Sequence, residues 1–277
     1  MKLPTIFMLL SASSSVWAED TNIQWRLDSK SQAAGTPNRA GIGAIVMLSS
    51  DIYLDFLGNA NFSDIGNNSS LEDTKVAGTS LSTSTRFGKR WAIDNNIYDI
   101  NFGYDTRQLK TGNTDNGVAV TDKKDVFFHQ LAFSASLLKN SLWGANTYAL
   151  IPIGNTEKEI NSQYNGEALN TYGLDLSHNL GESVNASLGY YYQDGHNGGV
   201  DGSGVRGGFT YKFNNQIFLS PNISYDDAFK THFSLDLTYQ FGKPKRKFIF
   251  AKNQNRDVRV QGACPNCTCN GGACNQI

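Results

Sequence analysis

The sequence lacks any long hydrophobic run. No stretch approaches the roughly 20 apolar residues that a membrane-spanning helix needs, which excludes a helical membrane protein. The formal net charge is only -1 over 277 residues, so there is no broad electrostatic case for binding nucleic acid. Proline is scarce, with 6 residues, and cysteine is absent before position 264. A cysteine-free body suits a chain that inserts unfolded into a membrane from an oxidising compartment.

The N-terminus has the features of a secretory signal peptide. Lys2 provides the positive end, residues 3–10 form a short apolar run, and Val16-Trp17-Ala18 is a small-x-small cleavage site. An N-terminal core helix is the alternative, but the run is short and a serine-rich stretch follows it. We therefore expect residues 1–18 to be a signal peptide, with cleavage near Ala18 and export of the mature chain.

Apolar and polar residues alternate along the whole chain. In the clearest run, residues 231–242, Phe233, Leu235 and Leu237 belong to a face that alternates with polar residues, as in a strand with one apolar face. Pro221 falls inside a weaker run, where we expect a bulge or a local break. Other clear runs cover 52–56, 98–105, 172–177, 184–193 and 205–213, and weaker ones cover 39–48, 76–88, 124–138, 142–153 and 216–225.

The connections between these runs alternate in length. Outer-membrane barrels have short periplasmic turns and longer external loops, whereas a soluble β-sandwich or jelly roll does not explain this regularity. With a brief first strand from Thr21 to Ser29, the alternation predicts an all-β fold, a transmembrane antiparallel β-barrel of about 12 strands with both ends in the periplasm. The short connections are 48–51, 89–95, 139–141, 179–183 and 214–215, and the longer ones are 62–73, 108–123, 155–167 and 194–202; the final connection, 226–230, is of intermediate length.

The polar face of each run would line the lumen of such a barrel. Charges there could form a selectivity filter or contact a plug. Alternatively, they could simply pair and hydrate one another and so hold the barrel's shape. The predicted lumen-facing charges are Asp55, Arg86, Asp99, Asp105, Asp175, Arg206, Lys212 and Asp236.

The sequence offers no convincing catalytic or metal site. His232, Ser234 and Asp236 share a strand face, but residues two apart on a strand are separated by ~7 Å, too far for a proton relay. Aspartates in the connections could ligate calcium, although such loops are more often simply solvated turns and none has the spacing of an EF-hand. We therefore expect no enzyme activity and no cofactor. The aspartates considered as calcium ligands are Asp115, Asp122, Asp125, Asp194, Asp201, Asp226 and Asp227.

All the cysteines lie near the C-terminus, at Cys264, Cys267, Cys269 and Cys274. Clustered thiolates suit zinc or copper. An exported chain meets an oxidising compartment, which favours two disulfides instead.

An ordered series of segments resembles a known family. Residues 78–91 (GTSLSTSTRFGKRW), 101–107 (NFGYDTR) and 148–154 (YALIPIG) resemble successive strands of the β-domain of inverse autotransporters, the intimin/invasin family. Residues 172–242 are similar as well, so the resemblance covers about residues 40–242.

The resemblance implies a twelve-stranded barrel, in agreement with the connection lengths. It also implies that the segment after the barrel re-enters it, crosses the pore and displays an adhesive passenger outside. This chain departs from the family because only residues 243–277 follow the barrel, without immunoglobulin-like repeats, and no peptidoglycan-binding module precedes it. By resemblance, residues 243–262 are the threading linker, and a periplasmic extension is the alternative. The basic cluster 243–247 could contact acidic lumen residues or an anionic surface.

The sequence thus predicts a signal peptide (1–18), a barrel (19–242), and a basic linker with a Cys-rich tail (243–277). The predicted function is an outer-membrane anchor of inverse-autotransporter type that displays a short C-terminal segment. A small porin-like channel for solutes is the alternative. We expect residence in a Gram-negative-type outer membrane. The expected partners are outer-membrane lipid and the outer-membrane assembly machinery, with no nucleic acid and a surface partner that the sequence does not identify.

Overall fold

The computed structural model describes most of the chain from residue 22 onwards. The predicted signal peptide (1–18), the basic cluster (243–247) and Cys264 lie outside the described residues. No helix long and apolar enough to cross a membrane occurs in the described part of the chain. The described residues are 22–33, 38–62, 74–76, 80–114, 121–162, 165–195, 201–227, 230–242, 256–263, 267–270 and 273–276.

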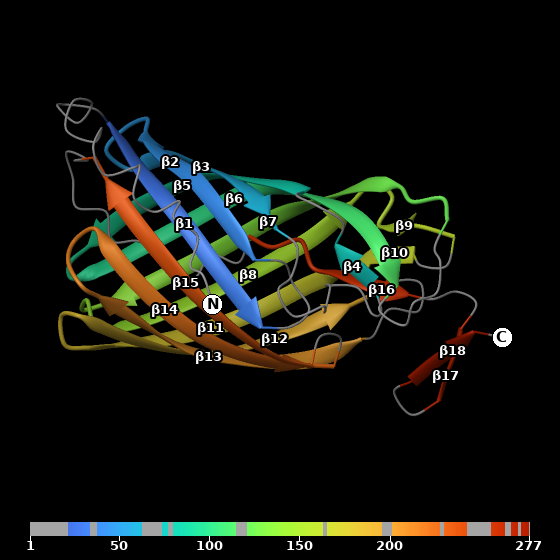
Figure 1. The fold of residues 1–277 in the computed structure, drawn as a ribbon. Coiled ribbons are helices and arrows are strands. Elements are labelled where there is room, and N and C mark those ends of the chain that lie inside the picture. Colours follow the sequence, from blue (N-terminus) through green and yellow to red (C-terminus); the bar gives the residue numbers. More distant parts are fainter. Residues whose placement is uncertain are drawn as a thin grey trace.

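Within those ranges, 12 antiparallel strands close into a tilted barrel (Figure 1). The first and last strands meet with Trp25 opposite Phe241, and the pairing of β6 with β7 completes the ring. The predicted fold class and strand number are therefore confirmed. The barrel strands are β1 (Ile23–Ala33), β2 (Arg39–Met47), β3 (Ile52–Asn61), β5 (Ser80–Ile93), β6 (Asn96–Thr114), β7 (Asp125–Lys139), β8 (Trp143–Ile153), β11 (Asn170–Leu180), β12 (Val184–Asp194), β13 (Gly202–Lys212), β14 (Ile217–Asp226) and β15 (Lys230–Phe241).

The period-two pattern sorts side chains between two environments. Along β3, Tyr53, Asp55 and Leu57 are buried, whereas Phe56 between them is 43% exposed. Large apolar residues cover the outer wall, for example Leu188 at 68% exposed. Successive residues of a strand point to opposite faces. The outer face of the barrel is therefore apolar and the inner face lines the lumen, as lipid-embedded barrels require.

The two ends of the barrel differ. Turns of two to four residues join β2 to β3, β5 to β6, β7 to β8, β11 to β12 and β13 to β14, and we call this the short-turn end. The opposite, long-connection end carries the longer connections, together with the three residues that join β14 to β15. Gly242 lies at the short-turn end, beside Ile23, so the barrel begins and ends there.

Pro221 interrupts one ladder of β14. The pairing with β13 runs from Gly204↔Asp226 to Gly208↔Asn222, stops, and resumes in the same register at Tyr211↔Leu219. Because proline has no N–H to donate, the ladder opens locally without the register shift that a bulge would cause. Of the two predicted outcomes, the structure shows the break.

Three short strands form a separate sheet at the long-connection end (Figure 1). β9 (Glu157–Glu159) and β10 (Asn165–Ala168) belong to the connection between β8 and β11, and β16 (Val260–Ala263) comes from the C-terminal tail. A further hairpin, β17 (Cys267–Asn270) with β18 (Ala273–Gln276), is drawn beyond the same end. β4 (Thr74–Val76) pairs with β6.

Candidate functional site

The lumen of the barrel contains a piece of the chain's own tail, residues 256–260, which we call the lumen segment. Side chains from eight barrel strands contact it, so it meets the wall on nearly every side. This arrangement makes the lumen, and not a surface pocket, the candidate site. The contacting residues are Lys30 (β1), Arg39 (β2), Asp55 (β3), Ser84 (β5), Arg107 (β6), Gln130 (β7), Tyr191 (β12) and Asp226 (β14).

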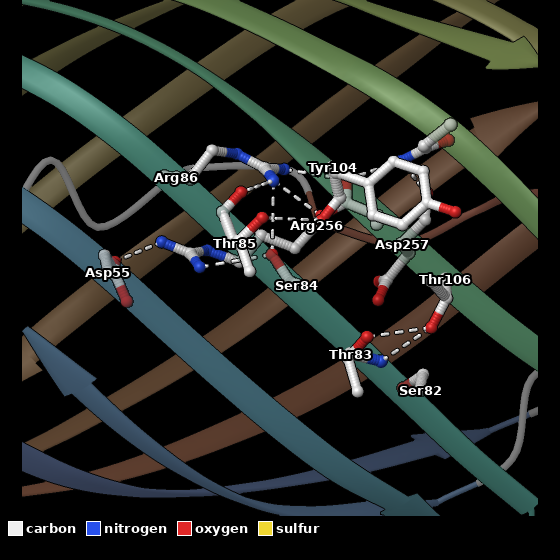
Figure 2. A network of polar contacts seen from close by, with 12 residues as sticks. Asp55, Ser82, Thr83, Ser84, Thr85, Arg86, Tyr104, Thr106, Arg256 and Asp257 are labelled. Atoms are coloured by element: carbon white, nitrogen blue, oxygen red, sulfur yellow. Dashed lines mark hydrogen bonds and ion pairs between the residues drawn. The ribbon is translucent and has the colours of Figure 1, made fainter.

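Arg256 binds the wall formed by β3 and β5 (Figure 2). Its guanidinium forms an ion pair with Asp55 and donates to Ser84 Oγ at 3.2 Å. Asp55 is 3% exposed, accepts from Arg26 Nη1 at 3.3 Å, and has its Oδ1 3.1 Å from Arg26 Nη2 in the same ion pair. Arg26 is in turn paired with Asp28, with Nε 3.0 Å from Oδ2. Positive and negative side chains therefore alternate in the order Arg256, Asp55, Arg26 and Asp28. This alternation offsets the cost of burying the charges.

Asp257 lies between two cations of the wall. Arg39 forms an ion pair with its carboxylate, and Lys30 Nζ is 3.7 Å from Oδ2. The main chain here is held as well: Gln130 Nε2 donates to the Asp257 carbonyl at 3.4 Å, and Arg107 Nη1 donates to the Val258 carbonyl at 3.0 Å. Buried carbonyls need such donors when no strand pairs with them. The wall thus recognises both the side chain and the backbone of the segment.

Arg259 binds the opposite part of the wall. Its Nη1 is 2.8 Å from Asp226 Oδ2, and its guanidinium lies 5.1 Å from the centre of the Tyr191 ring. Tyr191 donates its own hydroxyl to Asp226 at 2.5 Å. A Cβ on Gly204 would lie 2.3 Å from the Tyr191 ring, so only glycine at that position allows this tyrosine to lie flat on the wall.

An apolar cluster closes the lumen on the side of these charges that faces the long-connection end. Val258 and Val260 are at most 1% exposed and continue into β16, which pairs with β10. A Cβ on Gly166 would lie 2.6 Å from Ile160 Cδ1 and 3.1 Å from Val260 Cγ1, so the packing leaves no space there. The tail is therefore a structural part of the long-connection end. The cluster contains Leu109, Val126, Phe128, Ile160, Ala168, Val258 and Val260.

Several predicted lumen charges pair within the wall itself. Arg86 forms a bidentate ion pair with Asp105, with Nη1–Oδ1 at 2.5 Å and Nη2–Oδ2 at 2.8 Å. Both side chains are nearly inaccessible, at 2% and 0% exposed. Arg206 binds Asp175 at 2.5 and 2.7 Å. The first pair joins the neighbouring strands β5 and β6, and the second reaches across β12 to join β11 and β13.

The remaining predicted charges line the lumen at other positions along the barrel axis. Asp99 is buried near the short-turn end and binds Arg90, with Nε 2.8 Å from its Oδ2. Asp236 accepts from Asn222 Nδ2 at 3.0 Å and lies 4.0 Å from Lys30 Nζ. Lys212 is half-buried at the short-turn end of β13. Of the eight predicted charges, Asp55 forms an ion pair with the lumen segment.

Sequence reasoning missed most of the residues that hold the tail. Asp226 was assigned to a loop and considered for calcium, but it ends β14, is 1% exposed and binds Arg259. Arg39 begins β2, and Lys30 lies opposite it on β1, three residues before that strand ends. The only available signal was the alternation Arg256-Asp257-Val258-Arg259-Val260, a strand-like pattern inside the tail. No group of three or more metal-binding side chains occurs among the residues that the structure describes.

A polar cavity of about 260 Å³ remains beside the lumen segment. Side chains from most of the barrel strands line it, including the hydroxyl and amide groups of Ser220, Asn222, Ser224 and Ser234 on β14 and β15. Arg256, Asp257 and Arg259 of the lumen segment line it as well. The lumen segment therefore leaves space beside it for water or small solutes.

The fold resembles solved outer-membrane barrels, although no family model matches the sequence and no curated protein is similar to it. One similar chain, from "Unveiling the Mechanism Behind the in-meso Crystallization of Membrane Proteins", has a TM-score of 0.60 at 8% identity, over 87% of this chain and 100% of that chain. The COG4313 outer membrane channel from Pseudomonas putida F1 has a TM-score of 0.52 at 14% identity, over 79% and 95%. KdgM porin has a TM-score of 0.50 at 6% identity, over 78% and 99%. At such identities the likeness concerns the fold: this chain has the architecture of an outer-membrane β-barrel.

Proposed function

We propose that this protein is an outer-membrane anchor that holds its own tail in its lumen and displays the chain end outside, a role of inverse-autotransporter type. The observation that carries the proposal is the lumen segment, whose three charges each meet an opposite charge on the wall. A chance occupant would bury charges without such complementarity, at a cost of several kcal/mol per unpaired ion.

The course of the chain supports outward display. Gly242 lies at the short-turn end, whereas β16 pairs with β10 at the long-connection end. The 14 residue steps from 242 to 256 can span at most about 46 Å, more than the ~30 Å of a bilayer core. Short turns face the periplasm in outer-membrane barrels, so the residues after β16 would lie on the outer side.

Surface labelling tests this proposal. After mild reduction of intact cells, a membrane-impermeant maleimide should label the tail cysteines, which have no counterpart in the barrel. Two single-cysteine controls, in a background with all four native cysteines changed to serine, calibrate the two sides. Asp201→Cys marks the connection between β12 and β13, and Glu182→Cys marks the turn between β11 and β12.

The two controls make the result decisive. Labelling of the tail on intact cells, at the level of Asp201→Cys, supports display. Labelling only after permeabilisation, as expected for Glu182→Cys, contradicts it and leaves the tail on the periplasmic side.

A channel is the second candidate, because of the polar cavity beside the lumen segment. The fold likeness to KdgM porin and to the COG4313 channel supports this alternative as a porin-like pore that the tail narrows. Conductance of the reconstituted protein separates the candidates. A solute channel should conduct with its tail in place and discriminate between solutes of different size. An anchor should conduct little until residues 243–277 are removed.

A further inference from the structure

The C-terminal hairpin sets two cysteines directly across from each other. β17 (Cys267–Asn270) and β18 (Ala273–Gln276) pair so that Cys269 is opposite Cys274. Only Gly271 and Gly272 separate the strands in sequence, which is the length of a two-residue hairpin turn, and Gly-Gly is a favoured pair for such turns.

We propose that Cys269 and Cys274 form a disulfide that closes this hairpin covalently. In a two-residue hairpin the pair next to the turn, here Asn270 and Ala273, is the hydrogen-bonded one. The next pair is then a non-hydrogen-bonded pair, whose Cα atoms are about 4.5 Å apart. This separation lies within the range of roughly 4.4–6.8 Å that disulfides adopt.

The register also discriminates among the cysteines. Cys267 occupies the same strand face as Cys269, two residues away, and its partner position is Gln276. The ladder therefore gives Cys267 no cysteine opposite it. A pairing of Cys267 with Cys274 would be diagonal and would require the hairpin to shift its register.

The chemistry is a thiol–disulfide exchange. The Cys269 and Cys274 thiols lose two protons and two electrons and form one S–S bond. The electron acceptor is a protein disulfide of the oxidising envelope, which is reduced to two thiols through a mixed disulfide. The bond requires only exposure to that compartment. The proposal is therefore independent of which side of the membrane the tail occupies.

Peptide mapping of the wild-type protein tests the pairing. Trypsin cleavage after Arg259 leaves residues 260–277, which contain all four cysteines. Without reduction, backbone fragmentation on either side of Thr268 should release two separate pieces, and the piece with Cys269 and Cys274 should lack two hydrogen atoms. Every other pairing of four cysteines places a bridge across Thr268 and keeps the pieces joined, which would overturn the proposal.

Matched variants provide a second readout in the full-length membrane protein. Cys264→Ser/Cys267→Ser keeps the opposed pair and should show no alkylatable thiol until it is reduced. Cys264→Ser/Cys269→Ser keeps Cys267 with Cys274 and should show two thiols without reduction. Equal oxidation of both variants would contradict the register argument. Wild-type thiols that react without reductant, or only after a zinc or copper chelator is added, would show free or metal-bound cysteines and would equally overturn it.

Discussion

Replacing Asp257 by asparagine should release the lumen segment. The substitution keeps the size of the side chain and the hydrogen bond from Gln130 to the main chain, but it leaves Arg39 and Lys30 without their anionic partner in the tail. Removing one member of a buried ion pair costs about 3–5 kcal/mol. The Asp257 side chain is 33% exposed, so solvent screening reduces this to about 2–3 kcal/mol.

This loss corresponds to a roughly 30- to 150-fold lower ratio of docked to undocked tail. The assay is the open fraction of single barrels in planar bilayers, where we expect Asp257→Asn to open far more often than the wild type. Asp236→Asn is the matched control. It also removes a carboxylate near Lys30, at 4.0 Å, but its other partner, Asn222, belongs to the wall.

Two results would refute the reasoning. If Asp257→Asn behaves like both the wild type and Asp236→Asn, the ion pairs do not hold the tail. If the charge exchange Asp257→Arg with Arg39→Asp opens the barrel as much as Asp257→Arg alone, the interaction is not the direct one that the structure shows.

Three further predictions concern the barrel and its closed end. Leu188→Arg places a charge on the lipid face near the middle of β12 and should lower the free energy of unfolding by about 2–4 kcal/mol. Ser187 faces the polar cavity, so Ser187→Arg should lower it much less. Urea unfolding in vesicles measures both variants. Gly166→Leu overfills the apolar cluster at the long-connection end, should cost about 1–3 kcal/mol, and should expose Arg259 to trypsin in the folded protein. Arg86→Met leaves Asp105 buried without its partner and should cost about 3–5 kcal/mol in the same urea assay, whereas the double variant Arg86→Met/Asp105→Leu should recover most of that loss.

The barrel could be predicted because its strands lie between two environments of opposite polarity. A strand with lipid on one side and water on the other must alternate, and that alternation can be read locally, as in Phe233, Leu235 and Leu237 of β15. The lengths of the connections then gave the number of strands. The first strand was predicted to end at Ser29, whereas β1 continues to Ala33. The prediction stopped early because residues 30–33 contain no large apolar side chain and so show no alternation.

The tail contacts could not be predicted, because they depend on pairs that are distant in sequence. Arg256 and Asp55 are separated by 201 residues, and nothing local to either residue specifies the other. Asp226 was missed for a related reason. In the sequence it resembles Asp227, which follows it, whereas its pairing with Gly204 of β13 and Lys230 of β15 extends β14 far enough to bury it. Period-two reasoning identifies the face on which a charge lies, but not its partner.

Site-directed cross-linking in native outer membranes tests the central claim, that the tail occupies the lumen, most directly. In a background with all four native cysteines changed to serine, a short bis-maleimide should join Arg259→Cys to Asp226→Cys, since polar atoms of the two native side chains are 2.8 Å apart. A direct disulfide needs Cα atoms roughly 4.4–6.8 Å apart, so the bifunctional reagent replaces the length of the two native side chains. Arg259→Cys should not cross-link to Asp99→Cys, near the short-turn end. Equal cross-linking of both pairs, or of neither, would contradict a tail docked in the lumen.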